Sequence, residues 1–277
     1  MSSRNCIRPI VIEPISKTGW GLREILDNRE IAFFICWREI KVRYKQAVLG
    51  IAWAVIRPVM HMVVFSTIFG ALAKLPSDGV PYPVFIFCGI LPWQLFSQSV
   101  NATAGSLIAN RTLIDRVYFP RLIFPIASVF SSLFDFAVAF TVLAVMMVCY
   151  GIMPTANALL LPLLIILACG NALSIGLWMG ALSVRYRDFK QILPFMIQFW
   201  FYATPVVYSA TLVPEHLRVW YALNPMVGVV EGFRWALLAT AAFPAGPLLY
   251  SGLFAAGSIL GGIKFFQRMD RTLADVI

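Results

Sequence analysis

Long apolar runs separated by short polar segments dominate the chain. Six of these runs approach the roughly 20 residues that an α-helix requires to cross the hydrocarbon core of a bilayer. Continuous runs of this kind favour helices over a membrane β-barrel, whose strands show short alternating patterns. The pattern therefore predicts an all-α polytopic membrane protein with six transmembrane helices, at about residues 51–73, 82–107, 122–151, 157–184, 192–208 and 247–266.

A charged stretch rich in aromatic residues precedes the first of these runs. Residues 1–28 are polar and are predicted to form a cytoplasmic N-terminal segment. In residues 29–48, Phe33, Trp37 and Tyr44 fall on one side of a helical wheel, and most charged side chains fall outside that side. This favours an amphipathic interfacial helix with its aromatic side in the acyl region. The alternative is a packed outer helix of a soluble domain, which is less favoured because a spanning helix follows directly. Residues 49–277 are then expected to form a single transmembrane domain.

The segment between the fifth and sixth runs, residues 209–246, contains shorter apolar pieces. An additional crossing there would put the basic C-terminal tail on the same side as the nearly charge-free turn at 151–156. We therefore predict two short re-entrant helices that enter the outer leaflet and return. Such backbone is tolerated only where protein or a water-filled cavity surrounds it, so this segment is expected to line a pathway.

Basic residues are distributed unequally between the two sides of this predicted topology. Eighteen of the 22 Lys and Arg residues fall on the side of the N-terminal segment, three fall on the other side, and Arg57 lies within the first span. By the positive-inside rule, this asymmetry predicts that both termini lie in the cytoplasm. It also accounts for the net charge of +9 without a nucleic-acid partner.

The sequence carries few groups that could perform catalysis. It contains no GxxxxGK[ST] motif for ATP, no HExxH motif and no pair of membrane-facing carboxylates at helical spacing. Its five cysteines are scattered without CxxC spacing and are interpreted as small hydrophobic residues. We therefore expect no enzyme activity, and no cofactor or metal site on this chain.

Arg57, His61 and Asp135 are ionisable residues that lie well inside the predicted spans. A charge near mid-bilayer is costly and is by default a candidate for function. Asp135 is expected near the midplane, where a neighbouring helix would cap it, with His61 as a candidate partner. Arg57 is expected within two turns of the cytoplasmic end, where its long side chain can reach the interface.

Aromatic side chains and amides cluster in the second and fifth runs. The aromatic side chains of the fifth run lie deeper than an interfacial aromatic belt, which is the alternative interpretation. Aromatic rings stack on the C–H faces of sugars while amides hydrogen-bond hydroxyls. We therefore predict a channel for a sugar chain, lined by Trp93, Phe96, Gln98, Phe199, Trp200, Tyr202 and Tyr208.

Two predicted cytoplasmic segments mix basic, acidic and aromatic residues. They are either ordinary basic loops or short helices that dock onto a cytoplasmic partner. The docking interpretation makes residues 108–121 a coupling segment. Its candidate contacts, together with those of the second segment, are Asn110, Asp115, Arg116, Tyr118, Arg185, Arg187 and Asp188.

Five stretches together resemble a known family: REIKVRYKQAVLGIAWAVIRP, PYPVFIFCGILPWQLFSQSV, ANRTLIDRVYFPRLIFP, VRYRDFKQILPFMIQFWFYATPVVY and LNPMVGVVEGFRWALL. They are similar to the permease subunits of bacterial ABC polysaccharide exporters of the O-antigen, capsule and wall teichoic acid types, and most like the O-antigen branch. The resemblance implies a homodimer in the inner membrane that moves a lipid-linked polysaccharide outward. It also implies two copies of a separate ATPase subunit, which would bind ATP and Mg²⁺.

The resemblance further implies roles for the interfacial and re-entrant helices. The interfacial helix would surround the cytoplasmic gate and meet the anionic lipid head group of the polymer, through Trp37, Arg38, Tyr44 and Lys45. The re-entrant helices would close the outer mouth, with Trp220, Glu231, Arg234 and Trp235. Two alternatives remain open: an exporter of the same architecture for a small lipid or drug, and a membrane enzyme that builds the glycan.

Overall fold

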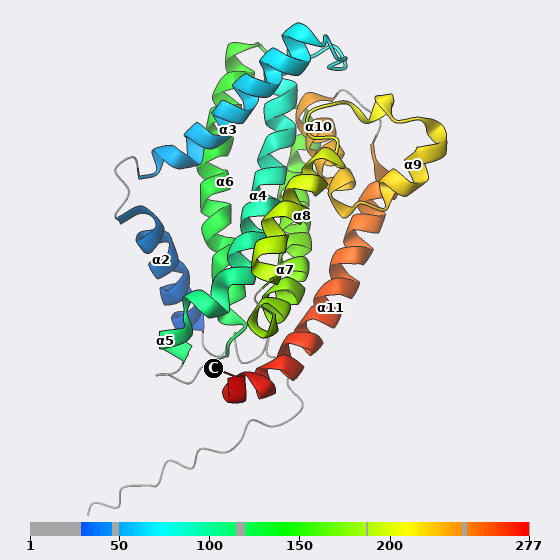
Figure 1. Cartoon of the computed structure of the whole chain (residues 1–277). Helices are drawn as coiled ribbons and strands as arrows, with labels where there is room; N and C mark the ends of the chain where they lie inside the picture. The colour runs from blue at the N-terminus through cyan, green and yellow to red at the C-terminus, as the bar shows by residue number, and fades with distance from the viewer. Residues whose placement is uncertain (1–28, 46–49, 115–119, 187, 240–242, 277) are drawn as a thin grey trace, which may run out of the picture.

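The structure is a computed structural model that describes residues 29–45, 50–114, 120–186, 188–239 and 243–276. Helices make up the regular structure of these residues, which contain no strand (Figure 1). In chain order the elements are α2 (Arg29–Lys45), α3 (Ala52–Phe65), η1 (Ser66–Leu72), α4 (Tyr82–Ala109), α5 (Arg111–Ile114), α6 (Ile123–Cys149), η2 (Ala156–Leu160), α7 (Leu161–Arg185), α8 (Phe189–Tyr202), η3 (Ala210–Leu212), α9 (Glu215–Ala222), α10 (Pro225–Leu238) and α11 (Ala245–Val276).

Five helices of the described chain are long and apolar enough to cross a membrane. They are α3 with η1, α4, α6, α7 with η2, and the part of α11 up to Phe266. Five of the six predicted spans are therefore present as helices of sufficient length. The predicted boundaries differ from these helices by only a few residues, because apolar run length and helix length follow the same bilayer dimension.

The fifth predicted span, at 192–208, is shorter than expected. Helix α8 has 14 residues and ends at Tyr202, which at 1.5 Å per residue gives about 21 Å. Pro205 lies just beyond this end, and proline lacks the N–H that a continuing helix would need. The chain instead turns through residues 203–208 toward η3 and α9.

Helix α4 is the centre of the bundle. Of its apolar window 78% is buried, against 6% to 33% for the other four spanning segments. It packs against α6, α7, α10 and α3. The contact with α7 is close because α7 presents glycine: a Cβ at Gly176 would lie 2.5 Å from the Cγ2 of Thr103. Small residues of this kind let membrane helices approach one another closely.

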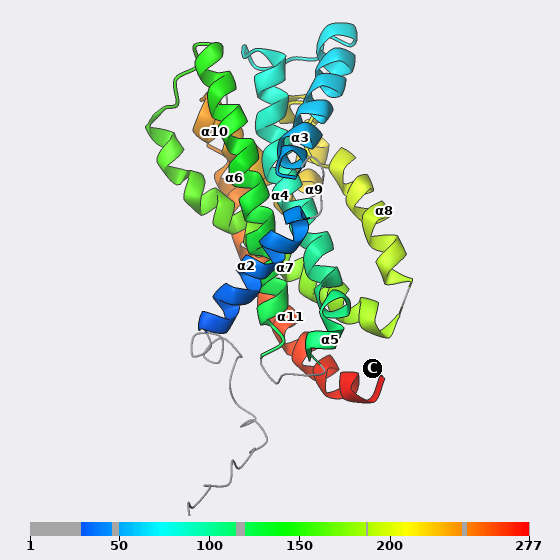
Figure 2. The same cartoon turned by 90° about the vertical axis from the view of Figure 1, so that its left-hand side faces the viewer.

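Helices α9 and α10 lie at the end of the bundle opposite to α5 and to the end of α11 (Figures 1 and 2). The side chain of Asn224 caps α10 by accepting a hydrogen bond from the backbone N–H of Met226. Helix α10 packs on α4, α7 and α11 and is largely buried, whereas α9 leaves Trp220 73% exposed. The two short helices predicted in 209–246 are thus present.

Helix α2 lies beside α6 near the α5 end of the bundle (Figure 2). It confirms the predicted helix as far as Lys45, and residues 46–49 lie outside the described part. The aromatic side predicted from the helical wheel is only partly correct. Phe33 and Trp37 are 71% and 47% exposed, but Tyr44 turns inward and donates a hydrogen bond to Asp135.

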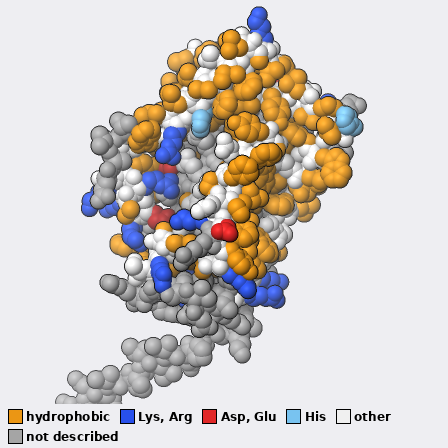
Figure 3. All heavy atoms as spheres, viewed as in Figure 1, with side chains coloured by type: hydrophobic (Ala, Val, Ile, Leu, Met, Phe, Trp, Pro, Cys, Tyr) orange, Lys and Arg blue, Asp and Glu red, His pale blue; other side chains and the backbone are white. Residues whose placement is uncertain are grey.

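Lys and Arg side chains gather toward the end of the molecule that carries α5, whereas the opposite half of the same face is mainly hydrophobic (Figure 3). This is the distribution that the sequence predicted for a protein with one basic side.

Candidate functional site

A line of polar side chains runs along the one exposed face of α4. Gln94, Ser97, Gln98 and Asn101 follow the i, i+3, i+4, i+7 spacing that places residues on one side of a helix. Each is at least partly exposed, although most of the helix is buried. Ser97 and Asn101 each donate one hydrogen bond to a carbonyl of their own helix, at 3.3 and 2.9 Å. The remaining donors and acceptors of this line favour contact with water or with another polar surface, because an unpaired polar group is costly in lipid. We call these four residues the polar stripe.

Helix α3 adds two ionisable side chains beside the polar stripe. His61 lies 3.2 Å from the amide of Gln94, measured from Nδ1 to Nε2. Arg57 precedes His61 by four residues and therefore shares its helix face. Both side chains are exposed, and the Arg57 guanidinium lies 5.9 Å from the centre of the Trp53 ring.

These contacts place the start of α3 beside the middle of the bundle. Gln94 lies twelve residues after the start of α4 and fifteen before its end, about 18 and 22 Å at 1.5 Å per residue. His61 contacts Gln94, and Ala54 lines a small cavity with Asp135. Within its own helix, Arg57 lies five residues after Ala52, where the span begins, which agrees with the expected position within two turns of the helix end.

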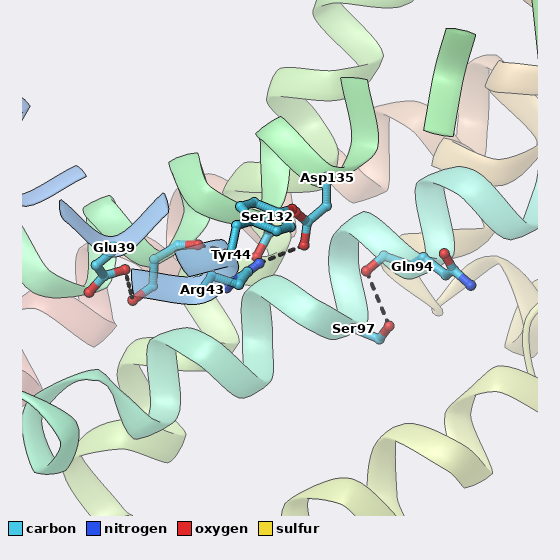
Figure 4. A network of polar contacts seen from close by, with 8 residues as sticks. Glu39, Arg43, Tyr44, Gln94, Ser97, Ser132 and Asp135 are labelled. Atoms are coloured by element: carbon cyan, nitrogen blue, oxygen red, sulfur yellow. Dashed lines mark hydrogen bonds and ion pairs between the residues drawn. The ribbon is translucent and has the colours of Figure 1, made fainter. Parts of the chain in front are cut away.

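Asp135 on α6 is neutralised by α2 (Figure 4). The guanidinium of Arg43 donates to its Oδ2 at 2.6 Å, and the Tyr44 hydroxyl donates to its Oδ1. The side chains of Arg43 and Asp135 are 33% and 14% exposed, so the pair is only partly screened by solvent. His61, the partner proposed from the sequence, contacts Gln94 instead. That expectation is corrected, because α2 brings a permanent cation within reach of the carboxylate.

A second polar contact ties α2 to the junction between α4 and α5. The amide of Asn110 donates to Glu39 at 3.4 Å and accepts from Arg38 at 3.3 Å. Ser128 on α6 donates to the other oxygen of Glu39 at 3.2 Å. Burial raises the pKa of Glu39 above its ordinary value, and these hydrogen bonds partly oppose the rise.

The residues of the expected coupling surface have different environments. The Asn110 side chain is 6% exposed and is used inside the protein, so it positions the start of α5 and does not offer a free contact. At the turn between α7 and α8, the Arg185 guanidinium lies 5.4 Å from the centre of the Tyr186 ring. The carbonyl of Asp188 accepts the first backbone hydrogen bonds of α8. The remaining candidates, Asp115, Arg116, Tyr118 and Arg187, lie outside the described residues.

The aromatic candidates divide into a buried and an exposed set. Trp93 and Phe96 on α4 are 5% and 0% exposed and contact Phe201 and Trp200 at ring-centre distances of 5.7 and 5.3 Å. Their rings therefore pack inside the protomer, behind any surface that could line a channel.

Phe199 and Tyr202 on α8 form the exposed set, at 71% and 57% exposure. Trp200 is half-buried and donates from its indole nitrogen to Asn224 at 2.9 Å. The half-buried Tyr208 accepts a hydrogen bond from the Tyr221 hydroxyl on α9. Of the seven predicted channel residues, Phe199, Tyr202 and Gln98 thus have rings or amides that a polymer could reach from outside the protomer.

Arg234 on α10 makes its contacts inside the protein. Its side chain is buried and donates to the carbonyls of Val206 and Tyr208, at 2.7 and 3.1 Å. Its guanidinium also lies 3.8 Å from the centre of the Phe85 ring on α4. Arg234 therefore fixes the turn after α8 onto α4 and α10, because these carbonyls have no helical partner.

The other three residues assigned to the outer mouth are more accessible. Glu231 lines a cavity of about 290 Å³ together with Tyr221 and Arg218. Trp235 stacks edge to face on Phe243, with ring centres 4.8 Å apart. Trp220 is the most exposed of this group.

The sequence did not single out Glu39 and Ser128. Glu39 was considered only as one charge of an amphipathic helix. The available signal was its spacing of four residues from Arg43, which puts both on the face that meets α6. Ser128 gave no signal, since an isolated serine in an apolar run is common in membrane helices.

An apolar helical bundle that keeps a polar stripe at mid-depth is typical of membrane proteins that carry a polar pathway. The sequence profile of the ABC-2 type transporter family matches residues 32–238. The chain belongs to this family, and is a multi-pass protein of the inner membrane.

Curated relatives cover nearly the whole chain. The O-antigen export system permease protein RfbA of Myxococcus xanthus is 31% identical over 216 residues, which is 77% of this chain and 82% of that protein. A protein of the same name from Klebsiella pneumoniae is 27% identical over 246 residues, covering 87% and 92%. The polysialic acid transport protein KpsM of Escherichia coli is 24% identical over 245 residues, covering 85% and 92%.

Proposed function

We propose that the chain is the channel-forming permease of an ATP-driven ABC exporter that moves a lipid-linked polysaccharide from the cytoplasm across the inner membrane. The observation that carries the proposal is the polar stripe on α4, halfway along a spanning helix. Its amides can hydrogen-bond sugar hydroxyls, while the exposed rings of Phe199 and Tyr202 can stack on sugar C–H faces. The names of the relatives, which refer to O-antigen export and polysialic acid transport, support a polysaccharide as the cargo.

The proposed channel requires two copies of the chain. In one copy the polar stripe is open on its outer side, and the α3 segment beside it is only 6% buried. A second copy would close the stripe into a water-filled path and would cover part of the apolar surface of α3. A two-fold dimer is also the commonest form of closed homo-oligomer among soluble proteins.

The proposed topology has six crossings. Helix α8 and the turn after it would form the crossing that α8 alone is too short to make, and α9 and α10 would be the re-entrant pair at the outer mouth. Both termini would lie in the cytoplasm, because Lys and Arg gather at the α5 end.

Energy would come from a separate ATPase subunit, present in two copies and carrying the ATP and Mg²⁺. The sequence has no P-loop motif of its own. The subunit would dock on α5, the residues that follow it, and the turn between α7 and α8. Arg38, Trp37 and Lys45 on α2 would meet the head groups of membrane lipids and of the cargo, with Trp37 and Lys45 exposed for this contact.

Deletion of the gene and complementation in its native host test the proposal. The deletion strain is expected to lose surface polysaccharide and to accumulate lipid-linked polymer in the cytoplasm, and the intact gene is expected to restore export. Normal surface polysaccharide together with new sensitivity to lipophilic drugs would instead indicate the small-lipid or drug exporter. Turnover of a nucleotide sugar by the purified chain would indicate the glycan-building enzyme.

A further inference from the structure

Arg57 lies beside the middle of α4, and no carboxylate among the described residues neutralises it. Its side chain is exposed on the face of α3 that adjoins the polar stripe. In the part of the chain that the structure describes, no ion pair involves Arg57, and its defined contact is the ring of Trp53. A charged side chain inside a spanning segment is costly, and Arg57 is the sixth residue of the span that begins at Ala52. No ion pair among the described residues offsets this free-energy cost, so the presence of Arg57 requires a functional explanation.

Arg43 provides the internal comparison. It also points toward the polar region between α3, α4 and α6, where Asp135 lies. The fold supplies Arg43 with a carboxylate at 2.6 Å and supplies Arg57 with none. Because this comparison holds for the residues that the structure describes, a ligand from outside the protomer is the candidate that could neutralise Arg57.

Arg57 adds a group that only donates hydrogen bonds to a place where Gln94 and His61 can both donate and accept. Arginine presents five N–H donors in a planar fork that matches phosphate and carboxylate oxygens. His61 follows one turn later, and its contact with Gln94 brings a side-chain amide to the same place. The amides alone can hydrogen-bond neutral sugar hydroxyls. The guanidinium adds a preference for a negatively charged ligand.

We propose that Arg57, with His61 and Gln94, is a binding site for an anionic group of the transported molecule, a phosphate or a carboxylate, as that group passes the middle of the channel. This inference rests on the proposed function and refines it, because it assigns particular residues of the channel to the anionic part of the cargo. The group is either the phosphate that joins the polymer to its lipid or a carboxylate on the sugars themselves.

Calorimetric titration of the full-length chain, purified with its partner ATPase in zwitterionic nanodiscs, tests this site. The first pair of probes is a short polyprenyl pyrophosphate and the matching uncharged polyprenol. The second pair is an oligosaccharide that contains glucuronic acid and its neutral glucose counterpart. Arg57→Gln is expected to weaken binding of the anionic member of at least one pair by about tenfold, which corresponds to the loss of one charge-assisted contact. Binding of the neutral member of the same pair is expected to stay unchanged.

Two matched variants control the result. Arg57→Lys keeps the charge and is expected to retain binding within about fivefold, because lysine lacks only the second arm of the fork. Lys41→Gln removes an exposed cation that lies over Trp37 on α2 and is expected to bind like the wild type. Thermal melting of each variant shows that a loss of binding is not a loss of folding.

The pair whose anionic and neutral members the Arg57→Gln variant no longer distinguishes identifies the source of the anion, either the lipid phosphate or a sugar carboxylate. Equal binding of anionic and neutral probes by the wild type, or unchanged binding by a folded Arg57→Gln, would overturn the site. The failure of the proposed function is separable: a deletion strain with normal surface polysaccharide would overturn export, whatever the titration shows.

Discussion

The guanidinium of Arg43 lies 2.6 Å from the carboxylate of Asp135, although 92 residues separate them in sequence. Arg43 belongs to α2, which lies beside the bundle, and Asp135 to α6, which spans it. The same α2 binds Asn110 at the junction of α4 and α5 through Arg38 and Glu39. Helix α2 is thus held between the middle of the bundle and the segment proposed to dock an ATPase, so movement at one contact can reach the other.

Removal of one partner of this ion pair is expected to loosen α2. Asp135→Asn should cost about 1–3 kcal/mol of docking free energy, between the values for exposed and buried pairs, because both side chains are partly exposed. Hydrogen exchange of the amides in 29–45 measures the effect. Exchange in the rest of the bundle should change little.

The exchanged pair Arg43→Asp with Asp135→Arg is the control. It should recover part of the lost protection, since the opposite charges are again adjacent. Equal hydrogen exchange of α2 in the wild type, in Asp135→Asn and in the exchanged pair would show that the ion pair does not hold α2.

Docking of α2 is expected to weaken as pH rises. Burial raises the pKa of Glu39 above its ordinary value of 4.5, so the docked helix holds a proton that the undocked helix releases. The docked form is then favoured below about 4.5 and loses this advantage as pH rises through the raised pKa.

Glu39→Gln should remove this dependence while keeping one side-chain oxygen to accept from Asn110, and its NH2 group can donate to the Ser128 hydroxyl. Hydrogen exchange of α2, corrected for the intrinsic pH effect and measured between pH 4 and 8, compares the two proteins. A wild type whose α2 becomes more protected as pH rises would contradict the assignment.

Loss of the Arg234 side chain is expected to release the turn after α8. Arg234→Met keeps much of the apolar volume but leaves the carbonyls of Val206 and Tyr208 without their donors, at about 1–3 kcal/mol for each buried unpaired group. Thermal unfolding should occur at lower temperature, and protease should cut within 203–213. Lys74→Gln, another basic residue toward the same end, serves as the control. Wild-type melting of Arg234→Met would show that these hydrogen bonds contribute little.

Exposed and buried aromatic residues should respond differently to truncation. Phe199→Ala removes a ring that is 71% exposed, so export should fall while stability changes by less than about 1 kcal/mol. Phe96→Ala empties a fully buried position and should cost about 3–5 kcal/mol of stability. Surface polysaccharide and thermal melting, measured on both variants, separate the two effects. Full export by Phe199→Ala would remove that ring from the path.

Much of the fold follows from the sequence because membrane thickness fixes the length of an apolar helix. The span at 192–208 was the exception: apolar composition continues after Tyr202, but Pro205 and the donors of Arg234 favour a turn. The partner of Asp135 was also missed. A carboxylate in a span demands a donor, yet only the tertiary path of α2 determines that this donor is Arg43 and not His61. Likewise, aromatic residues in consecutive positions must point in different directions, and only the structure shows that Phe199 is exposed while its neighbour Trp200 binds Asn224.

Thiol labelling of α4 in membranes tests the central claim most directly. Single cysteines are introduced at Gln94, Ser97, Gln98 and Asn101, and at the buried control Val100, in a chain whose own five cysteines are replaced. A membrane-impermeant cationic methanethiosulfonate reagent, applied to the assembled exporter, is expected to modify the four stripe positions and to block export, and to leave position 100 unmodified. Unmodified stripe positions, or full modification without loss of export, would contradict a water-filled transport path along α4.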